Sequence, residues 1–251
     1  MRDKLLSEID GARKALLQAH DQVARLWAKH GSPEFHESVL TAVVLSRSKA
    51  LTRAFFDLLV TQNLTTAAPL LRLQLDSLLR LVAMYLVADQ HEFFEAILDG
   101  ENVSRCKDAG GNRMTDKYLC DRVAEFAPWV RSLYKQASGF IHLSYKHIAA
   151  TVQGYPDQGT IGVWMADEES YLEDDSYDSI AGAFGLATRM LLDFICEVND
   201  PNEAHVSYAE RRDKALSRMA KSVGDMIREH GIPATAAEID YLAPSERTPG
   251  A

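Results

Sequence analysis

The chain has 251 residues, of which 47% are apolar and 25% charged, and its formal net charge is −9. These proportions exclude a largely disordered chain, and a chain of this length can bury a core without help from disulfides or metals. Its three cysteines form no CxxC pair, so we expect a reducing compartment, the cytoplasm. The N-terminus is charged throughout, and the longest apolar stretch, near 78–88, contains Arg80. We therefore expect neither a signal peptide nor a membrane span.

The charge is unevenly distributed along the chain. Residues 165–203 hold eleven acidic side chains and one arginine, whereas residues 100–150 hold eight basic and five acidic side chains. The overall negative charge disfavours a nucleic-acid binder that relies on a simple basic patch. The mildly basic middle of the chain leaves an anionic partner open.

Apolar residues recur at three- and four-residue steps through most of the chain, which predicts a series of helices. We expect these helices to lie at about 3–29, 33–62, 66–88, 91–98, 115–127, 129–137, 177–198 and 202–230. The third is apolar around most of its circumference and should therefore be central. The predicted fold class is all-α, a helical bundle over residues 1–200 followed by a C-terminal helix and flexible tail over 201–251.

Three segments depart from the helical pattern. The glycines of residues 100–114 indicate a mobile loop. Near 145–166, two β-prone runs flank a Gly-Tyr-Pro-Asp-Gln-Gly turn, which predicts a small β-hairpin or an irregular insertion. The acidic run 167–178 is expected to be a solvated loop, with the next helix capped by Ser176.

Several chemistries lack their sequence motifs. The chain contains neither GxxxxGK[ST] nor GxGxxG, so it has no phosphate-binding loop of a known type. It also lacks HExxH, the Glu-x-x-His of di-iron bundles and the GxSxG elbow of α/β-hydrolases. We accordingly expect no cofactor and no metal.

The apolar third helix carries Arg72, Asp76 and Arg80 at steps of four, which places the three charges on one face. Buried charges must be paired, because removing one partner costs about 3–5 kcal/mol. Two interpretations follow. The three residues form an ion ladder that holds helices in register, or one arginine reaches an anion in a cleft.

A second group of polar residues lies at 134–147. Ser138 and His142 are four positions apart, so a continuous helix would place them one turn apart, and Tyr134, Lys135 and His147 are close in sequence. His142 could act as a general acid or base near neutral pH. Alternatively, Ser138 and His142 hydrogen-bond each other at a helix end without catalysing anything.

Two weaker patterns involve metal-ligand residue types. His91 and Glu95 share one helix face, and we interpret them as a surface pair because the sequence offers no further ligands. Asp174, Asp175 and Asp178 could bind a divalent cation, but they lack the spacing of a calcium loop.

Taken together, these residues resemble a known family. An apolar helix with Arg72-x-x-x-Asp76, followed by Tyr134-x-x-x-Ser138-x-x-x-His142 and a β-prone stretch, is similar to a group of bacterial helical proteins distantly related to HEPN domains. The name stands for higher eukaryote and prokaryote nucleotide-binding. The resemblance covers roughly residues 35–200, and its motifs are short. The fold that it implies is a helical bundle with a small insertion.

The resemblance also implies a chemistry. HEPN domains often act as metal-independent ribonucleases, working as dimers with an Arg-x4–6-His motif at the dimer cleft. In this chain Lys135 lies seven residues before His142, where that motif would have arginine, and lysine lacks the bidentate fork of arginine. Members of the group are associated with toxin–antitoxin or phage-defence systems, and some are non-catalytic.

Two hypotheses follow. In the first, which we favour slightly, the chain is a binding or regulatory module in a bacterial stress or phage-defence system, and the apolar stripe of 202–230 mediates self-association into a homodimer. In the second, it is a nuclease directed at RNA, with His142 as acid or base, Lys135 or Arg72 holding phosphate, and Ser138 orienting the imidazole. RNA or a nucleotide is the candidate partner in either case, and whether the chain is an enzyme stays open.

Overall fold

The computed structural model describes residues 2–30, 35–141, 148, 151–153, 162–163, 168–169, 172–203 and 205–230. Its α-helices are α1 (Arg2–His30), α2 (Phe35–Val60), α3 (Leu64–Met84), α4 (Gln90–Leu98), α5 (Asp116–Ala124), α6 (Trp129–Ser138), α8 (Asp174–Val198) and α9 (Tyr208–His230). Short 3₁₀ turns occupy Val103–Arg105 and Pro201–Glu203. The prediction of an all-α helical bundle is confirmed.

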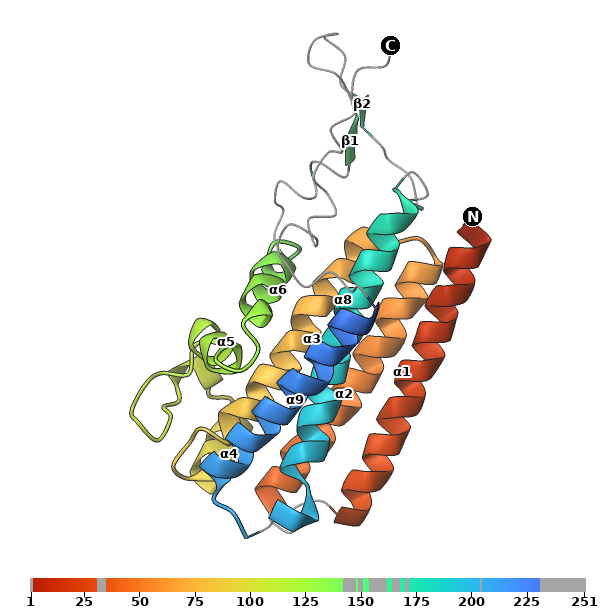
Figure 1. Cartoon of the computed structure of the whole chain (residues 1–251). Coiled ribbons are helices and arrows are strands. Elements are labelled where there is room, and N and C mark those ends of the chain that lie inside the picture. The colour runs from red at the N-terminus through yellow and green to blue at the C-terminus, as the bar shows by residue number, and fades with distance from the viewer. Residues whose placement is uncertain are drawn as a thin grey trace.

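The five long helices α1, α2, α3, α8 and α9 run side by side, while α5 and α6 lie against α3 on one flank (Figure 1). As predicted, α3 is central: fourteen of its residues are buried, and it contacts α2, α8, α6 and α5. Its N-terminus is capped by Asn63, whose side chain accepts a hydrogen bond from the Thr66 amide at 3.1 Å. It ends at Met84, earlier than predicted, because Tyr85 and Leu86 donate to carbonyls three residues back.

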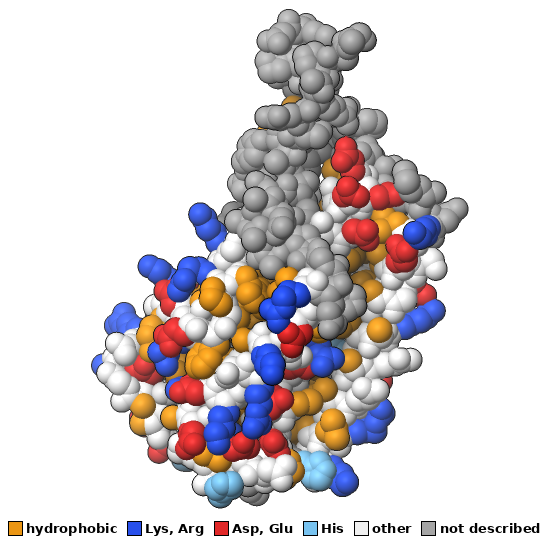
Figure 2. All heavy atoms as spheres, in the orientation of Figure 1, with side chains coloured by type: hydrophobic (Ala, Val, Ile, Leu, Met, Phe, Trp, Pro, Cys, Tyr) orange, Lys and Arg blue, Asp and Glu red, His pale blue; other side chains and the backbone are white. Residues whose placement is uncertain are grey.

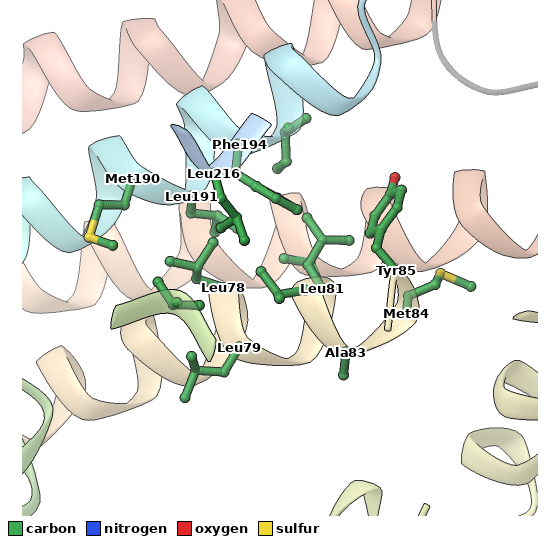
Figure 3. Packing of buried hydrophobic residues seen from close by; sticks show 14 of the residues in the cluster. Leu78, Leu79, Leu81, Ala83, Met84, Tyr85, Met190, Leu191, Phe194 and Leu216 are labelled. Carbon is green, nitrogen blue, oxygen red and sulfur yellow. The ribbon is translucent and has the colours of Figure 1, made fainter. Parts of the chain in front are cut away.

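Two buried hydrophobic clusters follow the length of α3. One joins its first half to Phe55 and Phe56 of α2 and to Phe184 of α8, with the Phe55 and Phe184 rings stacked 3.9 Å apart between centroids. The other joins its second half to α8 and α9 (Figure 3), where Leu78 and Leu81 face Phe194 and Leu216. Burial of these side chains supplies the main stabilising term of the fold.

The apolar stripe of α9 packs inside this chain. Leu216, Met219 and Val223 are each 1% exposed or less and belong to the same hydrophobic cluster as α3 and α8. These three residues are therefore covered within the chain and offer no surface to a second copy. The homodimer stays a prediction without that support.

Two predicted loops are partly regular structure. Residues 100–114 form a loop between α4 and α5, as predicted, and this loop contains the turn at Val103–Arg105 and an antiparallel bridge between Lys107 and Arg113. The carboxylate of Asp108 organises the tip by accepting from the amides of Gly110 and Asn112. The loop in the acidic run ends earlier than expected, because α8 begins at Asp174. Acidic side chains stabilise the N-terminus of a helix, so the last residues of the run are helical.

The predicted β-hairpin is present as two short strands, β1 (Val152–Gln153) and β2 (Gly162–Val163), which pair antiparallel. Most of the rest of the segment lies outside the described residues. Among the described helices, α8 has the length and apolar composition of a membrane span, and 61% of that window is buried inside the molecule.

Candidate functional site

The charged face of α3 points toward α5 and α6, where it meets a carboxylate from a distant part of the chain. Asp116 is the first residue of α5, and Thr115 caps that helix as predicted by accepting from the Tyr118 amide at 3.2 Å. The cap fixes the start of α5 against α3. Asp116 thereby lies between the two arginines of α3, whose sequence spacing had placed them on one face.

Arg72 is at the centre of this network, which we call the Arg72 network: Arg72, Asp76, Arg80, Asp116, Tyr134 and Ser138. Its guanidinium contacts Asp76, lies 2.9 Å from Asp116 Oδ2 and donates through Nε to Ser138 Oγ at 3.3 Å. It also lies over the ring of Tyr134, 3.8 Å from the centroid, and donates to the tyrosine hydroxyl. With only 8% of the residue exposed, Arg72 is committed to protein partners.

Arg80 completes the charge balance. Its Nη2 contacts Asp116 Oδ1 and lies 3.7 Å from Asp76 Oδ1. Two arginines therefore face two aspartates, and the Arg72 network carries no net charge. Balanced charges stabilise a partly buried cluster of this kind, whereas removal of one partner leaves a charge that is less well compensated.

Arg47 of α2 borders the network on its other side. Its Nη1 donates to the Leu73 carbonyl at 2.8 Å and to the Ser77 hydroxyl. Partial burial lowers the pKa of Arg47, Asp76 acts against that change and Arg80 adds to it. Arg47 thus stabilises the middle of α3 by capping a helical carbonyl rather than by pairing with a carboxylate.

The other predicted residues divide between the network and the surface. Ser138 donates its hydroxyl proton to the Tyr134 carbonyl at 2.8 Å within α6 and accepts from Arg72. Lys135, in contrast, is exposed on α6. His142 and His147 lie outside the described residues, and their predicted roles stay predictions.

The structure therefore brings together five residues that the sequence singled out, Arg72, Asp76, Arg80, Tyr134 and Ser138. Sequence reasoning missed Asp116, which is essential to the charge balance of the set. The available signal was a threonine followed by an aspartate at a helix start, which predicts a capped helix but not a partner for a helix elsewhere.

Comparison of the chain with protein-family models, with curated proteins and with solved structures found no match.

A second polar network, which the sequence did not predict, is fully enclosed by α1, α2, α3 and α8. His20 donates from Nδ1 to the Leu16 carbonyl at 2.7 Å, and its Nε2 lies 2.9 Å from Ser48 Oγ. Gln74 donates to Ser48 at 2.6 Å and to Thr188 at 3.1 Å. Nδ1 must donate because a carbonyl only accepts, and in the neutral imidazole that burial favours Nε2 then accepts from the serine hydroxyl. Burial lowers the pKa of His20.

A third network joins α9 to the start of α2. Glu37 is 0% exposed and accepts from Tyr85 and from Arg211 Nη2, at 3.1 and 3.2 Å in the latter case. Burial, followed by the nearby charge of Glu37, raises the pKa of Tyr85 well above its ordinary value. The Arg211 guanidinium also lies 4.7 Å from the ring centroid of Tyr208. These contacts hold α9 against the start of α2, although the two segments are far apart in sequence.

Basic side chains gather on the flank formed by the 100–114 segment, α5 and α6 (Figure 2). Lys107 and Arg113 oppose each other in the antiparallel bridge, so both cations stand on one face of it. Both are exposed, as are Lys117 and Lys135, and in the part of the chain that the structure describes none of these four pairs with a carboxylate. We call Lys107, Arg113, Lys117 and Lys135 the basic flank.

Proposed function

We propose that this chain is a binding or regulatory module that takes RNA as its anionic partner and does not cleave it. The observation that carries the proposal is the closed Arg72 network. A nuclease that held phosphate through Arg72 would need that guanidinium to be free. Arg72 instead has two aspartates, a tyrosine and a serine as partners and is 8% exposed.

Within α6, the described candidate residues divide between the Arg72 network and the exposed surface. Tyr134 and Ser138 of α6 face Arg72, whereas Lys135 follows Tyr134 directly and is therefore turned about 100° away around the helix. Ser138 has a single hydroxyl proton and uses it within its own helix. These contacts favour a structural role for Arg72, Tyr134 and Ser138.

The basic flank supports an anionic partner. Like charges directly opposite each other on an antiparallel pair destabilise it, and Lys107 and Arg113 keep this arrangement with no described carboxylate between them. A phosphate backbone along the flank would relieve the repulsion and release counterions. The resemblance to HEPN proteins agrees with RNA as that partner and with a role in bacterial stress or phage defence.

Binding and cleavage can be measured in one experiment. Fluorescence anisotropy with labelled tRNA in EDTA, at several salt concentrations, compares wild type with K107E/R113E. We expect the double reversal to weaken binding at least tenfold, about 1.4 kcal/mol, and to flatten the salt dependence. The matched control is K221E/R228E, which makes the same charge change at exposed positions of α9.

Equal weakening by both double variants would show that only net charge matters and would overturn the basic flank as the binding surface. The same tRNA samples are run on a denaturing gel. Intact RNA supports the module. Cleavage that disappears in His142→Ala would overturn the module and establish the nuclease alternative.

A further inference from the structure

Three residues with metal-ligand side chains meet where the start of α2 approaches α4. His36 lies in the first turn of α2, and His91 and Glu95 lie four residues apart on α4, so both side chains occupy one face of that helix. Asp89 caps α4 by accepting from the Glu92 amide at 3.0 Å, which fixes the turn that carries His91. The sequence indicated only a surface pair, because His36 is 55 positions from His91.

The donor atoms of the three side chains converge. His36 Nε2 and His91 Nδ1 are 2.8 Å apart, and one ligand atom from each of His36, His91 and Glu95 lies within 4.8 Å of the others. The two imidazole centroids are 4.5 Å apart with a tilt of 46° between the rings. In such a contact one nitrogen donates its proton and the other accepts it through its lone pair; both nitrogens can bind a metal ion once the donating ring carries its proton on its other nitrogen.

The position of His36 is supported from behind by aromatic side chains. Its ring lies 5.4 Å from the Phe94 ring and 5.7 Å from the Phe35 ring between centroids. Phe94 is 4% exposed and belongs to the hydrophobic core, whereas His91 and Glu95 are exposed. The site thus has an apolar wall on one side and solvent on the other.

We propose that His36, His91 and Glu95 bind one divalent transition-metal ion, with Zn²⁺ as the best match. Two imidazole nitrogens and one carboxylate oxygen form the three-ligand set that zinc takes in protein sites with an open fourth position. Zn–N bonds of about 2.0–2.1 Å in a tetrahedral arrangement separate two nitrogens by about 3.3 Å. The nitrogens therefore need to move apart by about 0.5 Å, which exposed side chains achieve by small rotations.

The consequence for the fold is a link between α2 and α4. The metal would connect the first turn of α2 to two turns of α4 and would exist only in the folded chain. A metal ion that binds only the folded state stabilises that state. The stabilisation grows with the logarithm of the ratio between the free metal concentration and the dissociation constant. The fourth coordination position faces solvent and is open to water or an anionic group.

The test uses the full-length protein, stripped with a chelator and titrated with Zn²⁺ against a chromophoric competitor. We expect one strong site per chain and a melting temperature that rises with Zn²⁺. His36→Ala, His91→Ala and Glu95→Gln should each weaken binding at least about tenfold and remove the thermal shift. Circular dichroism establishes that each variant is folded.

Two control variants match these changes. His205→Ala removes an exposed histidine elsewhere, and Glu92→Gln neutralises the other glutamate at the start of α4. Both should keep wild-type affinity. The spectrum of the Co²⁺-loaded protein should lack a thiolate charge-transfer band, because the proposed ligands contain no sulfur. A thiolate band, no stoichiometric binding, or equal affinity in all variants would overturn the site.

Discussion

Arg72 Nη2 and Asp116 Oδ2 lie 2.9 Å apart although 44 positions separate the two residues. This pair connects the middle of the central helix to the first residue of α5. The side chain of Arg72 is 9% exposed and that of Asp116 is 39% exposed, so the arginine depends on its partners more than the aspartate does. The fold of the α5–α6 flank is therefore sensitive to this one guanidinium.

The first prediction concerns that dependence. Arg72→Ala leaves the partly exposed Asp76 and Asp116 with Arg80 as their remaining described cation, and we expect it to lower the free energy of unfolding by about 1–3 kcal/mol. Urea denaturation followed by circular dichroism measures the change. The control is Arg131→Ala, which breaks the exposed pair with Asp121 and should cost less than about 1 kcal/mol. Equal stability of the two variants would show that the Arg72 network contributes nothing to the fold.

The second prediction concerns acid stability. Burial lowers the pKa of His20 in the folded state, while the unfolded chain has the ordinary histidine pKa of about 6.5. Between these two values the unfolded state binds more protons, so His20 contributes a loss of stability that begins as the pH falls below about 6.5. Above that pH the term is absent.

The contribution of His20 is isolated by measuring the free energy of unfolding of wild type and of His20→Gln from pH 8 to pH 5. Glutamine can replace the hydrogen bond to Ser48 but does not titrate, so we expect a lower stability at pH 8 and a shallower decline toward pH 5. Parallel pH profiles for the two proteins would contradict a neutral, buried His20.

The third prediction concerns α9. Arg211 neutralises Glu37 from 174 positions away, and Glu37 is fully buried. Arg211→Ala removes this partner, and we expect it to lower the free energy of unfolding by about 3–5 kcal/mol. Amide hydrogen exchange should rise in α9 and in the first turns of α2 more than in α3. Arg228→Ala, at an exposed position of the same helix, should leave the exchange pattern unchanged.

The helical architecture was predictable because it rests on local periodicity. The position of α3 followed from its apolar circumference, and the common face of Arg72, Asp76 and Arg80 followed from steps of four. The 100–114 segment was predictable as a loop from its glycines, but the hydrogen bonds that Asp108 accepts from the amides of Gly110 and Asn112 were not.

The contacts that complete each network were beyond the sequence. Asp116, Glu37 and His36 find partners 36 to 174 positions away, and no spacing rule operates at such separations. The stripe of α9 illustrates the same limit. Periodicity shows that one helix face must be covered, but it does not say whether α8 or a second copy of the chain covers it.

The fourth prediction concerns the three free cysteines. Burial raises the pKa of Cys120 and Cys196 to about 11 and raises the pKa of Cys106 as well. The thiolate is the reactive form, and Cys120 is also 4% exposed. In the native protein at pH 8 we expect iodoacetamide to modify Cys106 before Cys196 and Cys120 last, as read by mass spectrometry of the peptides over time. In urea the three rates should become similar, because unfolding removes the burial that separates them. Rapid native labelling of Cys120 would instead show that α5 separates readily from α3 and α6, contrary to the closed packing around Leu119 and Val123.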